Sequence, residues 1–214
     1  MNEKKMQDLI DKDEIRELLQ NWGFWRDQGN WEKLKTTFHP EGTMTVTWFS
    51  GRFDTFIRGS MEMRKTRSRS KHAILGSMIR LAGEPTTRAV SETNVLISGR
   101  SVLEGVELDS TAWARFYDQL EKRDGVWRIL KRVAIYEKDR FDPLVPGTPL
   151  PFSSKDLEAL PEPYSRLGYA LTKGGFPVSS DLPVNGSPAL DKLYAEGEAW
   201  LSAGTRPSLP GPAA

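Results

Sequence analysis

The sequence predicts an α+β protein in which helices come first and a meander of long strands follows. Apolar residues between positions 11 and 28 recur at helical spacing. Four later segments are rich in β-branched and aromatic residues and are separated by turn residues. Twelve of the fourteen prolines lie after residue 141. Because proline removes a backbone hydrogen-bond donor, we expect a folded domain over residues 1–140 and a Pro-rich extension over 141–214.

The first helix is predicted to begin at Asp11, with Glu14 completing a capping box. It should end near Gly29, a favourable C-cap residue. Its apolar stripe consists of Ile15, Leu18, Leu19, Trp22 and Trp25. The pattern next predicts a short helix over 30–38, a strand over 43–49 and a third helix over 53–63.

Four longer strands are expected over residues 72–81, 86–98, 107–122 and 126–136. Asp124-Gly125 lies between the last two and is typical of a hairpin turn. Helices are possible in the extension over 154–160, 164–171 and 188–201. Their Trp, Tyr and Leu content predicts that the extension packs on the domain or on a neighbouring subunit.

The composition excludes several classes of protein. The 214 residues are 38% hydrophobic and 28% charged, which is typical of a soluble globular protein, and no stretch approaches the ~18 apolar residues of a membrane span. The net charge of +1 gives no support for nucleic acid as the main partner. Cysteine is absent, which excludes disulfides, thiolate metal sites and cysteine nucleophiles. The charged N-terminal segment has no apolar signal core, so we expect a cytoplasmic protein.

Three stretches resemble a known superfamily. The stretch WRDQGNW (25–31), with FHPEG (38–42), is similar to its helix, acidic residue, turn and first strand. The stretch KHAILG (71–76) is similar to a strand that begins with a pocket-facing histidine. The stretches ARFYD (114–118) and RDGVWRI (123–129), with Arg132, are similar to the closing hairpin. Their order and spacing over residues 8–140 resemble the SnoaL-like branch of the nuclear-transport-factor-2-like superfamily.

The resemblance implies a cone-shaped barrel, in which a curved mixed or antiparallel sheet wraps around the N-terminal helices. An apolar pocket would open at the wide end, and association into dimers or trimers through the outer sheet face would be common. The superfamily contains scytalone dehydratase, hexachlorocyclohexane dehydrochlorinase, ketosteroid isomerases, polyketide cyclases and formaldehyde-releasing lyases. It also contains non-catalytic modules, so the fold does not decide the function.

Asp27 and His72 are the candidate catalytic residues. In the dehydratase and dehydrochlorinase branch, an aspartate at the end of the first helix orients a histidine that acts as general base. A neutral imidazole can accept a proton at neutral pH, and a carboxylate on its other nitrogen fixes the tautomer. The alternative is that Asp27 caps the turn at residues 28–30 and that His72 is an ordinary strand residue.

Arg132 is the candidate for holding a leaving group or an oxyanion, as the resemblance implies. Its alternative is a surface pair with Asp118 or Glu137. Lys131 should point to the opposite side of the strand. By the same alternation, Met78 and Arg80 share a side with His72 and could line the pocket.

Aromatic residues are the candidate pocket walls, with plain core packing as the alternative for each. The candidates for substrate binding are Phe24, Trp48, Phe116, Tyr117 and Tyr136. Tyr117 and Tyr136 could also donate a proton or anchor an oxyanion, and strand alternation alone does not choose between them.

No metal motif is present in the sequence, and we expect neither a metal nor a cofactor. His39, beside Pro40, is expected to be structural. The basic run over 64–71 is expected to be a solvated loop that could also act as a lid.

Together these features predict a cofactor-independent lyase that acts on a mid-sized apolar or aromatic small molecule and forms a homo-oligomer. The reaction would be a dehydration, a dehydrohalogenation or a release of formaldehyde. The alternatives are an isomerase or cyclase that uses the same base, and a non-catalytic ligand-binding or assembly module.

Overall fold

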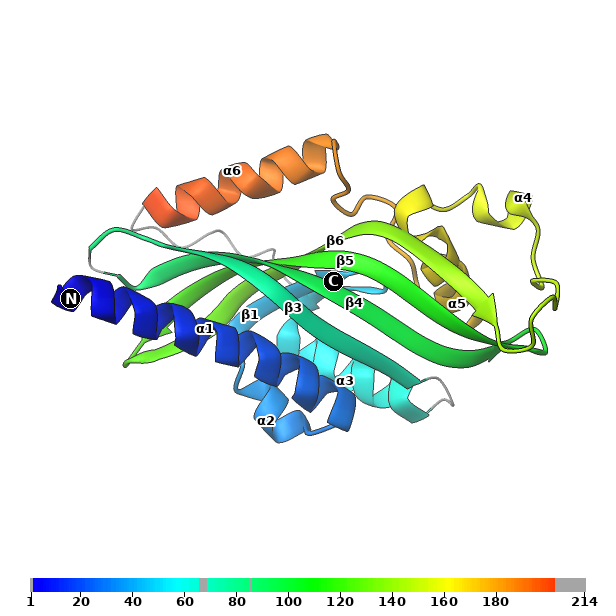
Figure 1. The fold of residues 1–214 in the computed structure, drawn as a ribbon, viewed down its shortest axis with the longest axis horizontal. Coiled ribbons are helices and arrows are strands. Elements are labelled where there is room, and N and C mark those ends of the chain that lie inside the picture. The colour runs from blue at the N-terminus through cyan, green and yellow to red at the C-terminus, as the bar shows by residue number, and fades with distance from the viewer. Residues whose placement is uncertain (1, 66–68, 85, 203–214) are drawn as a thin grey trace.

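The computed structural model describes residues 2–65, 69–84 and 86–202 (Figure 1). The N-terminal half begins with α1 (Glu3–Gln28), α2 (Trp31–Lys35), β1 (Phe38–Val46), β2 (Phe49–Arg52) and α3 (Phe53–Lys65). Four long strands follow: β3 (Arg69–Leu81), β4 (Arg88–Leu103), β5 (Val106–Arg123) and β6 (Val126–Pro143). The C-terminal part contains α4 (Ser154–Leu157), a 3-10 turn η1 (Glu162–Tyr164), α5 (Ser165–Lys173) and α6 (Pro188–Ser202). The predicted α+β class is confirmed.

The strands form one mixed six-stranded sheet in the order β2-β1-β6-β5-β4-β3. Among the six described strands, β1 and β6 pair in parallel and the other neighbours are antiparallel. The sheet curves around α1 and α3 but does not close into the expected barrel, because β2 and β3 remain its two edges (Figure 1).

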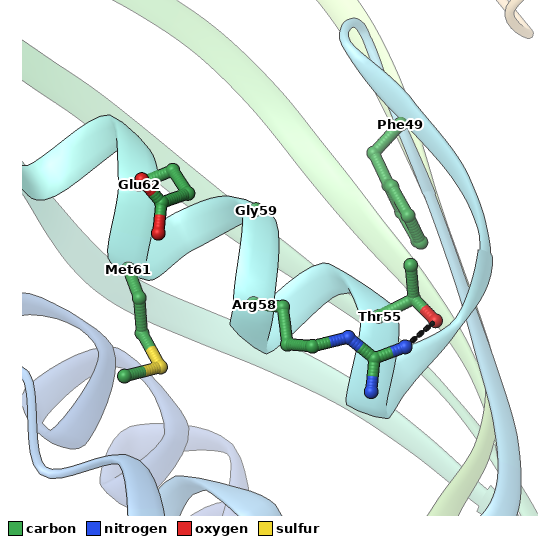
Figure 2. Close-up of a pocket in the computed structure, with 6 residues that line it drawn as sticks. All are labelled: Phe49, Thr55, Arg58, Gly59, Met61 and Glu62. Carbon is green, nitrogen blue, oxygen red and sulfur yellow. Dashed lines mark hydrogen bonds between the residues drawn. The ribbon is translucent and has the colours of Figure 1, made fainter.

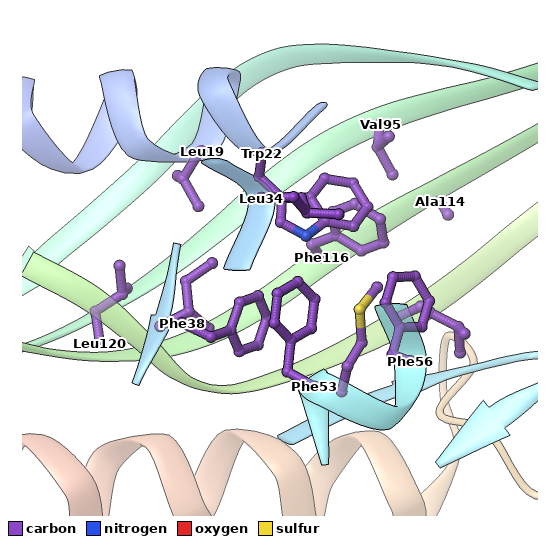
Figure 3. Close-up of a cluster of buried hydrophobic side chains, with 14 of the residues drawn as sticks. Leu19, Trp22, Leu34, Phe38, Phe53, Phe56, Val95, Ala114, Phe116 and Leu120 are labelled. Atoms are coloured by element: carbon purple, nitrogen blue, oxygen red, sulfur yellow. The ribbon is translucent and has the colours of Figure 1, made fainter. Parts of the chain in front are cut away.

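The helices cover the sheet from both sides. In Figure 1, α1, α2 and α3 lie along one face of the sheet, α6 crosses the opposite face, and α4 and α5 lie at one end. Figure 3 shows the main core between the first helices and the sheet, in which Trp22 of α1 meets Phe116 of β5 with ring centroids 5.2 Å apart. In the same core, Phe38 and Phe53 stack at 3.6 Å.

Helix α1 begins before the predicted cap. Asn2 is its N-cap and accepts a hydrogen bond from the Lys4 backbone N–H at 2.8 Å. Asp11 lies buried within the helix and accepts from the Trp127 indole at 2.8 Å and from Lys122 at 2.6 Å, so the predicted cap at Asp11 is wrong. The helix ends as predicted at Gly29, whose φ of 71° is a left-handed conformation that favours glycine. Within the described ranges, no helix is long and apolar enough to span a membrane.

The C-terminal segments pack against the sheet. Strand β6 extends to Pro143, beyond the expected boundary at residue 140, and η1 and α5 lie beside it. Helix α6 buries Leu190, Leu193 and Trp200 on the outer face, where they meet a second apolar cluster of β4, β5 and β6. The division of the chain into a domain and an extension at residue 140 stays a prediction.

Candidate active site

Asp27 and His72 lie in direct contact. The His72 ring Nδ1 is 2.6 Å from one carboxylate oxygen of Asp27, and the His72 backbone N–H donates to the other oxygen at 2.8 Å. Both side chains are nearly enclosed, with 6% of Asp27 and 10% of His72 exposed. The carboxylate therefore fixes both the strand backbone and the ring of the histidine.

Close packing between α1 and β3 makes this contact possible. A β-carbon added at Gly23 would lie 2.7 Å from Cγ1 of Ile74, so only glycine lets the helix approach the strand this closely. Asp27 then stands one turn later, near the end of α1. The Arg64 guanidinium, from the last turn of α3, donates to the Asp27 backbone carbonyl at 2.6 Å and ties the two helix ends together.

The protonation of the pair follows from its surroundings. Burial opposes ionisation, but the hydrogen bonds and charge of His72 lower the pKa of Asp27 below its usual value. Burial lowers the pKa of His72, against the raising effect of Asp27, and the charges of Arg26 and Arg132 lower it further. At neutral pH the pair is thus a carboxylate and a neutral imidazole. Because a carboxylate only accepts hydrogen bonds, Nδ1 carries the proton and Nε2 holds the free lone pair.

His72 and Asp27 line a cavity of about 1,630 Å³. Its inner wall is aromatic and includes Trp22, Trp48, Phe56, Phe116 and Tyr136. Trp22 also contacts the His72 ring edge-on, with centroids 5.4 Å apart. No described residue forms a hydrogen bond with Nε2 of His72, which leaves this nitrogen available to a molecule in the cavity.

Three of the predicted aromatic residues therefore line the cavity: Trp48, Phe116 and Tyr136. The Tyr136 hydroxyl lies 3.3 Å from the Thr47 hydroxyl, and burial raises the pKa of Tyr136, so its phenol stays protonated.

Phe24 and Tyr117 do not line the cavity. Phe24 is 53% exposed on another side of α1, where Lys71 lies 5.3 Å from its ring. Neighbouring residues of a strand point to opposite faces, so Tyr117 turns away from Phe116 and lies buried beneath α6. The predicted roles of these two residues in substrate binding are not supported by their positions.

Arg132 is completely buried in a double hydrogen bond with Asp118, at 2.7 and 2.8 Å. Its guanidinium carbon lies 4.6 Å from the Trp22 ring centroid and 4.4 Å from that of Phe116. It lies on the inner side of the sheet but is not among the residues that line the cavity. Its partner Asp118 is the one named in the alternative, although the pair is buried and not on the surface. Lys131 points outward, as expected, and pairs with Glu196 of α6 at 2.5 Å.

The expectation that Met78 and Arg80 share the face of His72 is wrong. The pairing of β3 with β4 shifts between Ile74 and Ser77, and this bulge reverses the alternation of the side chains. Met78 is consequently exposed, and Arg80 pairs with Glu198 of α6 on the outer face.

Several residues that line the cavity were not predicted from the sequence, among them Arg26 and a group from the C-terminal part of the chain. Arg26 directly precedes Asp27 and lies on the same side of α1 as Trp22, four residues earlier. This spacing is the signal from which Arg26 could have been predicted. The C-terminal group consists of Leu167, Ala170, Leu171, Lys173, Gly174 and Phe176. Helix α5 is held there by Asp139 of β6, whose carboxylate accepts from the Leu167 backbone N–H at 2.7 Å.

A second, smaller hollow of about 410 Å³ lies beside α3 and β2 (Figure 2). Its charged residues are Arg58 and Glu62, and Glu62 pairs with Lys65. Its lining includes neither Asp27 nor His72.

His39 is buried, and its Nε2 lies 3.0 Å from the Glu121 carbonyl oxygen, which is the structural role expected of it. The basic run was expected to be a solvated loop that could also act as a lid, and its residues 66–68 lie outside the described residues. Of the remaining run, Arg64, Ser70 and Lys71 line the cavity.

The chain matches known proteins over most of its length. An uncharacterized protein of Emericella nidulans is 31% identical over 209 residues, which cover 90% of this chain and 87% of the relative. Pea pathogenicity protein 2 of Fusarium vanettenii is 31% identical over 204 residues, which cover 90% of this chain and 86% of the relative.

Solved structures share the fold at low identity. A scytalone dehydratase-like protein of Novosphingobium aromaticivorans has a TM-score of 0.56 at 16% identity, over 70% of this chain and 99% of its own. A hexachlorocyclohexane dehydrochlorinase has a TM-score of 0.51 at 18% identity, over 69% of this chain and 97% of its own. The SnoaL-like domain family itself matches residues 7–133. The chain therefore belongs to the SnoaL-like family.

Proposed function

We propose that this protein is a cofactor-independent lyase in which His72 is the general base and Asp27 supports it. The observation that carries the proposal is the 2.6 Å contact between the Asp27 carboxylate and Nδ1 of His72, at the wall of a large cavity. Similar folds in a scytalone dehydratase-like protein and a hexachlorocyclohexane dehydrochlorinase agree with this reaction class.

The reaction begins when Nε2 of His72 removes a proton from the substrate. The electrons of the broken bond form a new double bond, and the leaving group departs with the electrons of its own bond. The imidazolium that forms is stabilised by Asp27 at 2.6 Å. A halide would depart directly in this way, and a hydroxide would depart as water by taking the proton back from the imidazolium. In a release of formaldehyde, Nε2 would instead take the proton of a CH₂–OH hydroxyl; the C–O bond would become the double bond, and the electrons of the broken C–C bond would stay on the remaining fragment, which takes up the proton. Return of the proton to another carbon, with no departing group, would be an isomerisation.

The lining of the cavity supports the proposal that the substrate is aromatic or apolar. Trp22, Phe56 and Phe116 offer flat apolar surfaces beside His72, and such rings stack favourably on an aromatic guest. The C-terminal residues Leu171 and Phe176 also line the cavity, yet they leave the space beside His72 open. A cavity filled by the extension would instead have supported a non-catalytic module.

Arg132 has a supporting role in this proposal. Its positive charge acts on His72 and lowers the pKa of the imidazole. Its Nη1 atom is buried without a hydrogen-bond partner among the described residues. Two hydrogen bonds to Asp118 hold the Arg132 guanidinium in place. The positive charge of Arg132 stabilises negative charge that develops on the substrate near His72.

Association into a homo-oligomer is part of the proposal. Helix α6 already covers a region of the outer sheet face through Leu193 and Trp200. A partner subunit on this face would therefore contact α6 or the part of the sheet that α6 leaves uncovered.

The experiment is a screen of aryl alcohols, aryl halides and hydroxymethyl aromatics in deuterated water, with NMR detection of both deuterium incorporation and products. His72→Gln should abolish turnover and exchange on any active compound, since it removes the base. His39→Gln is the matched control and should retain both, because His39 is remote from the cavity lining. Turnover that persists in His72→Gln would refute the mechanism.

A further inference from the structure

Arg26 is a buried cation that forms no hydrogen bond with any residue that the structure describes. Its side chain lines the cavity, and only 7% of the residue is exposed. Its Nε atom is buried and unbonded, and within the described ranges no carboxylate forms an ion pair with its guanidinium. Its contacts are the rings of Trp31 and Phe56, whose centroids lie 5.9 and 6.0 Å from the guanidinium carbon.

The residues outside the described ranges contain no acidic side chain that could pair with Arg26. Residues 1, 66–68, 85 and 203–214 include no Asp or Glu. Asp27 is the adjacent carboxylate, but its oxygens bond the ring and the backbone of His72. Burial is the largest effect on the pKa of Arg26 and lowers it; the charge of Asp27 raises this pKa and that of Arg64 lowers it, so Asp27 does not compensate for the burial.

The environment makes an unpaired guanidinium costly. Burial lowers the pKa of Arg26 to about 10, which still leaves it charged at neutral pH. A buried charge without a partner destabilises a fold unless an opposite charge arrives from elsewhere. Since Arg26 lines the cavity with His72, a ligand bound there can provide that charge.

We infer that the substrate carries an anionic oxygen group, and specifically that it is an aromatic carboxylate whose carboxylate is held by Arg26. A guanidinium offers paired N–H donors in a planar arrangement that matches a carboxylate. The ring would lie against Trp22, Phe56 and Phe116, with its reacting carbon beside His72. This inference rests on the proposed function for the identity of the reacting site, but the binding of the anion does not depend on catalysis.

The other cations of the cavity are already engaged. Arg100 forms two hydrogen bonds with Asp109, at 2.7 and 2.8 Å, and Arg140 pairs with Asp142. Lys173 pairs with Glu104, Lys71 lies 3.6 Å from the Asp27 carboxylate, and Arg64 donates to the Asp27 backbone carbonyl at 2.6 Å. Arg26 differs from these cations because, among the described residues, neither a hydrogen bond nor an ion pair engages its guanidinium.

The test compares 2-naphthoate with 2-naphthamide, which has nearly the same shape but no charge, by isothermal titration calorimetry at neutral pH. The wild-type protein should bind 2-naphthoate about tenfold or more tightly than 2-naphthamide, as a charge-assisted bidentate contact would give. Arg26→Gln should remove this preference and leave the affinity for 2-naphthamide within about twofold. Arg100→Gln, a matched change in the same cavity, should retain the preference.

Equal affinities in the wild type, a preference that survives Arg26→Gln, or no binding of 2-naphthoate would overturn the inference. His72→Gln distinguishes it from the proposed function, because that variant should lose turnover but keep the preference for the anion. A thermal measurement adds an independent check. Arg26→Met keeps the length of the side chain and removes the unpaired charge, so the ligand-free variant should melt at a higher temperature than the wild type; a lower melting temperature would show that Arg26 is a structural residue.

Discussion

Asp27→Asn isolates the contribution of the carboxylate to the His72 pair. The asparagine oxygen can still accept from the His72 backbone N–H, the bond that measures 2.8 Å in the wild type. Its NH₂ group then faces Nδ1 of His72, so the second bond, 2.6 Å in the wild type, loses its charge. The neutral ring must move its proton to Nε2 in order to accept from the amide.

The loss can be worked from the structure. One buried charge-assisted hydrogen bond contributes about 1.5–3 kcal/mol, and Asp27 is only 6% exposed, so little of this is screened by water. For a chain of this size, a loss of about 1 kcal/mol lowers the melting temperature by about 2–4 °C. We therefore expect Asp27→Asn to melt about 3–12 °C below the wild type at neutral pH.

The lowered pKa of Asp27 predicts how the stability difference between the wild type and Asp27→Asn changes with pH. The pKa of Asp27 is lower in the folded than in the unfolded protein, so its contribution to stability is present above about pH 4 and is lost as the pH falls through the folded pKa. Chemical denaturation of both proteins between about pH 3 and pH 8 measures this. The stability difference should shrink at the acidic end; equal stabilities at pH 7, or a difference unchanged at pH 3, would refute the reasoning.

Three further predictions concern the packing of α6, the pH dependence of turnover and the docking of α5. Because a β-carbon at Gly197 would lie 1.8 Å from the Tyr117 hydroxyl oxygen, Gly197→Ala should lower the free energy of unfolding by about 1–3 kcal/mol, and combining it with Tyr117→Phe should recover part of the loss; additive effects in denaturant titrations would contradict this contact. With any active substrate, kcat/KM should be constant above about pH 6.5 and fall only at lower pH, since the pKa of His72 is lowered by burial; a fall that begins well above neutrality would count against a neutral base. Asp139→Ala should weaken the docking of α5, because it removes the oxygen that accepts from the Leu167 N–H at 2.7 Å, and hydrogen exchange across residues 165–173 should accelerate; unchanged exchange would show that other contacts hold the helix.

Most of the order of elements and the candidate pair Asp27 and His72 could be predicted from the sequence. One strand was expected over residues 43–49, but the structure has two there, β1 (Phe38–Val46) and β2 (Phe49–Arg52). Helical spacing predicted α1, and turn residues such as Asp124-Gly125 separated the strands correctly, because these signals are local. Asp27 and His72 are 45 residues apart, and their contact was expected only through the resemblance to a family. Spacing alone could not show that Gly23 allows α1 and β3 to approach.

Side-chain direction along the strands was predicted less well. Alternation places Phe116 and Tyr117 on opposite faces, so only one of them could line the cavity. The bulge between Ile74 and Ser77 reversed the direction of Met78 and Arg80, and no residue in that stretch marks a bulge by itself.

Long-range partners were the least predictable feature. Asp11 has the spacing of a helix cap, yet it is buried against Trp127 at the far end of the domain sequence. The residues of α5 that line the cavity lie about a hundred positions after His72, in a segment whose composition indicated packing but not its target. Such contacts depend on tertiary packing, which overrides local propensity.

The most direct test of a neutral base at His72 is nitrogen NMR of the imidazole rings. The chain has only two histidines, so spectra of protein labelled at His72 and His39 can be assigned with one His39→Gln variant. At neutral pH, the His72 ring should carry its proton on Nδ1 and show a bare Nε2, with a midpoint of titration below about 6.5. A ring protonated on Nε2, or doubly protonated at neutral pH, would contradict the account.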